Sequence, residues 1–202
     1  MEHTVNPYFE ARAKNYAKQS GRGLWNRFRQ MEYSVVSDLL SGKAEESLVD
    51  LGCGAGYYAT QLKKDFGFNV VGVDSSPSML RHLDNSGIRT ILSTIESMPA
   101  AEKFDVALIA GVLEFIARPD LVFKKCAEIV KPGGRLVLLV PDDGVLGSLY
   151  RRFHEFQDCP TYLRSREQYV AMAKLKGFTL VKNRNCTPIS QAIAFQLSSA
   201  SV

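Results

Sequence analysis

The stretch that decides the fold is VDLGCGAGYY at residues 49–58, followed by VVGVD at residues 70–74. A short apolar run leads into three spaced glycines, and an amphipathic segment begins after them. Glycines allow a sharp turn and a close approach of the backbone to a ligand, and a helix N-terminus adds free N–H groups. Asp74 lies about 20 residues past the turn, where an open α/β sheet holds a ribose diol. The stretch therefore predicts a strand–turn–helix unit with a ligand site.

The glycine turn differs from the dinucleotide-binding pattern. That pattern requires a third glycine at position 57, where this chain has Tyr57. Asp50, just before the first glycine, would face a pyrophosphate unfavourably. An acid at that position favours a ligand with a cationic group, such as an amino group.

Outward from this unit, β-rich runs alternate with helical patterns. Strands are expected at 48–51, 69–73, 90–92, 104–109 and 135–140, and helices at 57–66, 77–83 and 121–130. Apolar strands separated by helices imply a parallel sheet covered on both faces. Two final strands, at 178–185 and 192–198, have no crossover helix between them and should pair as an antiparallel hairpin. The fold class is therefore α/β, a Rossmann-like seven-stranded, mostly parallel sheet with a C-terminal antiparallel hairpin, helices on both faces and an N-terminal helical cap.

The chain is expected to be a single domain over residues 1–202. Within it we expect four segments, which are a helical cap (1–45), a ligand-binding half (46–141), a lid (142–166) and a last helix with the strand hairpin (167–202). Two helices are expected within residues 6–41, one near 145–156 in the lid, and one at 167–176.

Composition excludes several classes of protein. Hydrophobic residues make up 46% of the 202 residues and charged residues 23%, as in ordinary globular domains. The net charge of +4 does not require a nucleic-acid partner. We see no apolar run of about 20 residues and no signal peptide. Four cysteines without a CxxC pair favour a reduced, cytoplasmic chain, and three histidines without metal-ligand spacing predict no metal.

Five segments in order carry a family resemblance. VDLGCGAGYYA (49–59) and VVGVDSSPSML (70–80) closely resemble motif I and the acidic-loop motif of class I S-adenosylmethionine (SAM)-dependent methyltransferases. IESMP (95–99) resembles the adenine-binding loop of that family, FDVALIAGVLE (104–114) its fourth-strand motif, and VKPGGRL (130–136) its turn into the fifth strand. The resemblance covers about residues 47–141 and is strongest to enzymes of quinone and secondary-metabolite biosynthesis.

The resemblance implies a SAM site and a product, S-adenosylhomocysteine. The glycine loop and Asp50 would hold the methionine part, Asp74 the ribose hydroxyls, and Ile95 the adenine. Thr94 stands where the family often has an acid, and Glu96 is the alternative. The full set of implied cofactor residues is Tyr16, Asp50, Gly52, Cys53, Gly54, Gly56, Tyr57, Asp74, Ser75, Met79, Ile95, Glu96, Ala110 and Gly111.

Methyl transfer requires the acceptor to be held in line with the methyl group, and a neutral oxygen acceptor must also lose a proton. His154 is the first candidate base because it follows the fifth strand in the expected lid. Tyr150 and Asp142 are further candidates. The alternative for His154 is a surface histidine with no role in the chemistry.

The size of the chain favours a small acceptor, of acidic, aromatic or lipid-like character, bound by a monomer or homodimer. We find no [DN]PPY or Pro-Cys sequence and no nucleic-acid module, which disfavours DNA. Two alternatives stay open. An RNA methyltransferase is suggested by the basic residues Arg12, Lys14, Lys18, Arg22, Arg27 and Arg29, and a non-catalytic SAM-binding protein would carry the same motifs.

Overall fold

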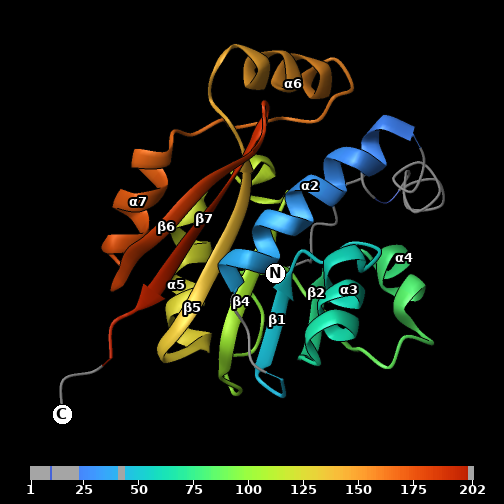
Figure 1. Ribbon diagram of the computed structural model, residues 1–202, viewed down its shortest axis with the longest axis vertical. Helices are drawn as coiled ribbons and strands as arrows, with labels where there is room; N and C mark the ends of the chain where they lie inside the picture. The colour runs from blue at the N-terminus through green and yellow to red at the C-terminus, as the bar shows by residue number, and fades with distance from the viewer. Residues whose placement is uncertain (1–9, 11–22, 41–43, 200–202) are drawn as a thin grey trace.

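The fold is built on one sheet of seven strands in the order β3-β2-β1-β4-β5-β7-β6 (Figure 1). The computed structural model describes residues 10, 23–40 and 44–199. The strands are β1 Ser47–Leu51, β2 Asn69–Asp74, β3 Arg89–Leu92, β4 Phe104–Ala110, β5 Val130–Pro141, β6 Phe178–Thr187 and β7 Ser190–Leu197. Strands β1 to β5 pair in parallel, and β7 is antiparallel to both β5 and β6. The predicted α/β class and the reversed C-terminal hairpin are confirmed.

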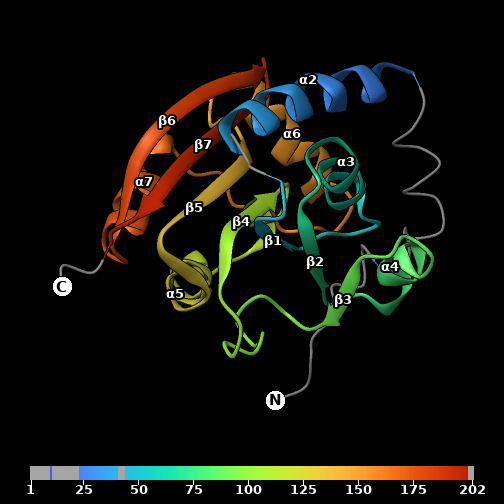
Figure 2. The same ribbon diagram turned by 60° about the horizontal axis from the view of Figure 1, so that its bottom comes forward.

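Helices cover both faces of the sheet (Figures 1 and 2). Their bounds are α2 Gly23–Leu40, α3 Tyr57–Phe66, α4 Pro77–Leu80, α5 Pro119–Ile129, α6 Val145–Glu155 and α7 Arg166–Lys174, with 3-10 turns η1 Arg81–Leu83 and η2 Leu113–Phe115. Successive strand residues point to opposite faces. In β5, Leu136 and Leu138 therefore pack with α5 and α7, whereas Val137 and Leu139 pack with α2 and α3.

Helix α2 has a different position from the one expected for a cap. Its C-terminal half packs on β5, β6 and β7 through buried Val36, Leu39 and Leu40. It therefore belongs to the layer that covers the sheet, and its preceding turns reach toward the carboxyl ends of the parallel strands. The first expected cap helix lies outside the described residues, apart from Glu10.

The fifth strand begins earlier than expected. Residues 130–134, predicted as a turn, are part of β5. The register with β4 shifts between Phe104 and Val106, and Gly133 has a positive φ of 76°. The glycines thus bend the strand without ending it.

The carboxyl ends of β1, β2, β4 and β5 meet at one edge of the sheet, and α6 lies above that edge (Figure 1). Ligands of open α/β sheets bind at this edge. Within the described ranges, no helix combines the length and apolar character needed to cross a membrane.

Candidate functional site

The turn between β1 and α3 is held in a conformation that favours glycine. Gly52 and Gly56 have φ values of 77° and 81°. The N–H of Gly52 donates to the carbonyl of Val73 at 2.7 Å, which ties the turn to β2. A Cβ atom at Gly52 would lie 2.5 Å from Cγ2 of Val112, and one at Gly56 would lie 2.2 Å from Cδ2 of Leu83. The turn therefore packs so closely against its neighbours that side chains are excluded.

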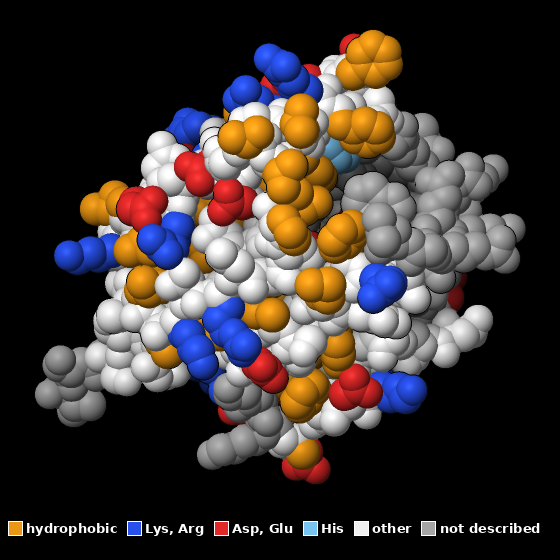
Figure 3. Space-filling view, turned by 45° about the horizontal axis from the view of Figure 1, so that its top comes forward, with side chains coloured by type: hydrophobic (Ala, Val, Ile, Leu, Met, Phe, Trp, Pro, Cys, Tyr) orange, Lys and Arg blue, Asp and Glu red, His pale blue; other side chains and the backbone are white. Residues whose placement is uncertain are grey.

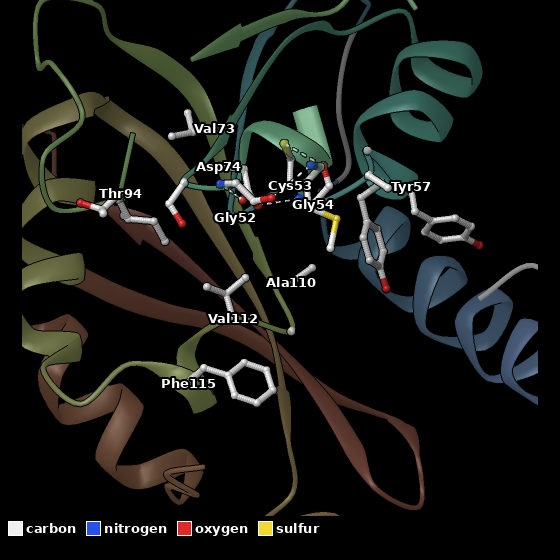
Figure 4. Close-up of a pocket in the computed structure, with 18 of the residues that line it drawn as sticks. Gly52, Cys53, Gly54, Tyr57, Val73, Asp74, Thr94, Ala110, Val112 and Phe115 are labelled. Carbon is white, nitrogen blue, oxygen red and sulfur yellow. Dashed lines mark hydrogen bonds between the residues drawn. The ribbon is translucent and has the colours of Figure 1, made fainter. Parts of the chain in front are cut away.

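Asp74, at the end of β2, lies beside this turn (Figure 4). Its Oδ2 accepts a hydrogen bond from the N–H of Gly54, and its Oδ1 one from the N–H of Ser76, both at 2.8 Å. Burial raises the pKa of Asp74, an effect that these backbone bonds oppose. Each oxygen retains a lone pair, so the fixed carboxylate can accept further bonds from a diol.

A pocket of about 740 Å³ opens at this point. Figure 4 shows Val112 and Phe115 across it from Asp74. Its lining includes nearly all the residues implied by the resemblance, which are Gly52, Cys53, Gly54, Gly56, Tyr57, Asp74, Ser75, Met79, Ile95, Glu96, Ala110 and Gly111. The volume, the backbone cradle and the half-buried carboxylate that lines the pocket fit an adenosyl ligand.

Two further implied cofactor residues are Tyr16 and Asp50. Tyr16 lies outside the described residues. Asp50 is 1% exposed and, like Leu48 two positions earlier, points to the face covered by α3. Burial, and next the charge of Asp74, raise the pKa of Asp50 to about 7, although it accepts a backbone bond from Ala59. Its Oδ2 has no hydrogen-bond partner among the described residues. The structure thus places Asp50 behind the turn and outside the pocket lining, and its role toward the methionine part stays a prediction.

The N-terminal segment contacts this region at one described position. The carboxylate of Glu10 accepts hydrogen bonds from the hydroxyls of Ser76 and Ser78. Both serines follow Asp74 in the chain, and Ser76 lines the pocket. The expected cap therefore has one residue beside the site.

The candidate bases Tyr150 and His154 lie together on α6. Their ring centroids are 4.4 Å apart, and the His154 ring lies 5.3 Å from that of Phe115, which lines the pocket. The Tyr150 hydroxyl donates to Oε1 of Glu114 at 3.4 Å. Neither candidate is itself in the lining, so both form a second layer behind Phe115.

Asp142, the third candidate, is placed in the turn before α6. Its Oδ1 accepts a hydrogen bond from the N–H of Gly144 at 2.8 Å. A Cβ on Gly147 would lie 1.6 Å from the carbonyl oxygen of Asp142. Asp142 is not in the pocket lining, and its side chain instead accepts the hydrogen bond that fixes the turn before α6.

The pocket lining also contains residues outside the implied cofactor set. Arg29 of α2 lies over the Tyr57 ring, with its guanidinium carbon 5.0 Å from the ring centroid, and both line the pocket. From the sequence, Arg29 is one of four arginines that could pair with the carboxylate of SAM or with an acidic acceptor, and its place in the lining is compatible with that expectation. Val112 and Phe115 also line the pocket. The signal for them in the sequence is Gly111, which follows the expected fourth strand; in the structure it has a φ of 68° and turns the chain away from β4.

The outer surface of α6 is apolar. Figure 3 shows hydrophobic side chains gathered near the top of the view. On α6 and just after it, the exposed residues are Val145, Leu146, Leu149, Phe153 and Phe156, the last 90% exposed. A strongly apolar helix surface beside a pocket is typical of binding surfaces. Among the described residues, no group of three or more His, Cys, Asp or Glu side chains could hold a metal ion.

Comparisons with known proteins agree with this geometry. A family model described as "Methyltransferase domain" matches residues 49–138. The ubiquinone biosynthesis O-methyltransferase of Cupriavidus pinatubonensis is 29% identical over 177 residues, which cover 76% of this chain and 69% of that protein. The protein of the same name from Bradyrhizobium diazoefficiens is 34% identical over 97 residues, which cover 45% of this chain and 38% of that protein. The chain spans about three fifths or less of several other relatives it matches.

Two solved structures show the same fold. One is a putative methyltransferase in complex with the Haloferax volcanii Trm112 methyltransferase activator. It has a TM-score of 0.81 and 16% identity, and the match covers 97% of this chain and 100% of that one. The other is magnesium protoporphyrin IX methyltransferase from Synechocystis PCC 6803 with bound S-adenosylhomocysteine. Its TM-score is 0.74 at 16% identity, and the match covers 95% of this chain and 96% of that one.

Proposed function

The chain belongs to the class I S-adenosylmethionine-dependent methyltransferases, and from this premise we propose that it transfers a methyl group from SAM to a small-molecule acceptor. The single observation that carries the proposal is Asp74, fixed by two backbone N–H groups at the edge of a glycine-lined pocket. When bound, SAM supplies a methyl group activated by a positively charged sulfur. The contribution of the protein is to bind, orient and desolvate.

Each part of the pocket has a distinct task in this proposal. Asp74 accepts hydrogen bonds from the ribose hydroxyls, and the backbone of the glycine turn adjoins the methionine part. Ala110 and Gly111, at the end of β4, form the wall next to the reacting end. Asp50 supports the turn from behind, because its carboxylate lies under the first turns of α3.

The acceptor is proposed to bind at the end of the pocket lined by Phe115, Ile116 and Arg118. That end is apolar apart from Arg118, and the exposed face of α6 extends the apolar surface beyond it. Both features favour an aromatic or lipid-like acceptor. The names of the first relatives, ubiquinone biosynthesis O-methyltransferases, are consistent with such an acceptor. Tyr150 and His154 are proposed to receive the proton of the acceptor from their position behind Phe115.

The proposed compartment is a reducing one. All four cysteines are free and buried, and buried free thiols are typical of proteins in such compartments.

The test is transfer of labelled methyl from SAM into a fractionated metabolite extract, with an RNA fraction alongside. We expect label in a small-molecule fraction and none in RNA, and loss of that label with Asp74→Asn. Label in RNA alone would favour the RNA methyltransferase. SAM binding by calorimetry without transfer to any fraction would favour the non-catalytic reading.

A further inference from the structure

A second buried acid lies at the opposite end of the pocket wall from Asp74. Glu114 of η2 is 2% exposed. Its Oε1 accepts the long hydrogen bond from Tyr150, and its Oε2 has no partner among the described residues. Burial raises the pKa of Glu114 to about 7. A buried carboxyl with an unpaired oxygen is costly to ionise, so burial favours the protonated form of Glu114.

The carboxyl of Glu114 is separated from the pocket by a residue without a side chain. Gly111 lines the pocket with a φ of 68°, and a Cβ built on it would lie 3.9 Å from Oε1 of Glu114. The glycine therefore lets the carboxyl approach the wall that adjoins the reacting end of the ligand. A larger residue there would lie between the acid and the pocket.

In the part of the chain that the structure describes, Glu114 has no ion-pair partner. The ion pairs among the described residues do not include it. Glu32 of α2 adds to the rise in its pKa, and Tyr169 of α7 and Tyr150 of α6 face it as neutral groups. The nearby guanidinium of Arg164 donates to the carbonyls of Leu113 and Ile116, at 3.1 and 2.9 Å. Among the described residues this carboxyl is therefore left without a counter-charge, and a cationic ligand in the pocket would supply one.

We propose that Glu114 is a proton-holding residue that loses its proton when a cationic cofactor occupies the pocket and regains one when the cofactor becomes neutral. This inference rests on the proposed function. A unit positive charge close to a carboxyl lowers its pKa by about 1–3 units. Starting near neutrality, such a shift ionises the group at physiological pH.

For an acceptor that carries an O–H or N–H bond, the net charge of the site is the same before and after methyl transfer. The bond between methyl and sulfur breaks with its electron pair left on sulfur, and the bond between methyl and acceptor forms. Because Tyr150 lies behind Phe115, the acceptor proton reaches the Tyr150 oxygen through one water, as Tyr150 gives its own proton to Oε1 of Glu114. One positive and one negative charge thereby disappear together, so no net charge is left in the buried site.

The experiment is titration calorimetry at pH 7 with SAM and with S-adenosylhomocysteine, each in two buffers of different ionisation enthalpy. The slope of the enthalpy against buffer gives the protons released. We expect SAM to release about half a proton more than the neutral product. The amino and ribose groups are shared by both ligands, so any contributions of Asp50 and Asp74 cancel in this difference.

Glu114→Gln should remove the difference in proton release and weaken SAM binding by about tenfold while leaving the product unchanged, since one pKa unit corresponds to a tenfold change. Compared with Glu114→Gln, Glu114→Asp should restore part of the difference in proton release and part of the SAM affinity. Glu32→Gln, which alters a half-buried acid near Glu114, is the matched control and should keep the difference. Circular dichroism checks that each variant is folded.

Equal proton release with both ligands in the unmodified protein would overturn the proposal, and that measurement needs no variant. A folded Glu114→Gln that keeps the difference would overturn it as well. Failure to bind either ligand would instead contradict the proposed function.

Discussion

The two ends of the pocket are built in opposite ways. At the cofactor end, a continuous piece of chain supplies the glycine turn, and backbone N–H groups fix Asp74. At the proposed acceptor end, side chains from η2, α6, α7 and α2 meet around Glu114, whose carboxyl accepts a long side-chain hydrogen bond from Tyr150. The first end is rigid and locally encoded, whereas the second depends on tertiary packing. Substitutions at the first should therefore cost more stability and affinity.

The largest effect is expected for Gly56→Ala. The substitution forces a left-handed conformation on alanine and drives its Cβ into Leu83, so unfolding free energy should fall by about 2–5 kcal/mol. Gly54→Ala is the matched control. Gly54 also has a positive φ but faces open space, so only about 1–2 kcal/mol should be lost. Urea unfolding measures both, and equal losses would contradict the packing argument.

Asp74→Asn should have the next largest effect, on binding. Loss of a charged hydrogen-bond acceptor costs about 1.5–3 kcal/mol, a reduction in affinity of roughly 10- to 150-fold. Calorimetry should show the same loss for SAM and for S-adenosylhomocysteine, because both carry the ribose. Asp84→Asn, on the exposed turn after η1, serves as control. Undiminished SAM binding by Asp74→Asn would remove the ribose assignment.

Asp50→Asn should change how stability depends on pH. The pKa of Asp50 is raised to about 7 in the folded protein, so the folded state binds more protons than the unfolded chain between about pH 4 and 7. Stability should therefore fall as pH rises through this window, by on the order of 1–2 kcal/mol between pH 5 and 7. The variant should lack this part of the slope and be more stable than the unmodified protein at pH 8. Thermal unfolding across pH tests this, and a parallel slope in both proteins would refute it.

The smallest effect is expected at the acceptor end. Tyr150→Phe removes one long hydrogen bond to Glu114, so unfolding free energy should fall by about 0.5–1 kcal/mol. SAM affinity should stay unchanged, since Tyr150 is not in the pocket lining. A loss of stability as large as that of Gly56→Ala would mean that the two ends do not differ as described.

Structural features that depend on a short stretch of neighbouring residues could be predicted from the sequence. Alternating apolar strands and helices predicted the sheet, and the absence of a crossover helix before residue 192 predicted the reversed strand. Because side chains alternate between the two faces of a strand, the position of Asp50 two residues after Leu48 also predicts that both side chains point to the same face. The role of Asp50 toward the ligand comes from the family resemblance alone and stays a prediction.

The acceptor end could not be predicted in the same way. Glu114, Tyr150 and Tyr169 are far apart in the chain, and only the packing of η2, α6 and α7 brings them together. Nothing in the spacing of Arg29 indicates that its guanidinium lies over Tyr57. These contacts depend on long-range geometry and not on a motif.

The position of β7 also has a consequence for how the protein is made. This strand lies between β5 and β6, yet it is translated after both. At roughly 5–20 residues per second, the ribosome needs several seconds to pass from the end of β5 to the end of β7. During that interval, the apolar edge of β5 has no neighbour on one side. A nascent chain at this stage exposes an unpaired strand edge, which makes it a natural client for chaperones and the stage most prone to aggregation.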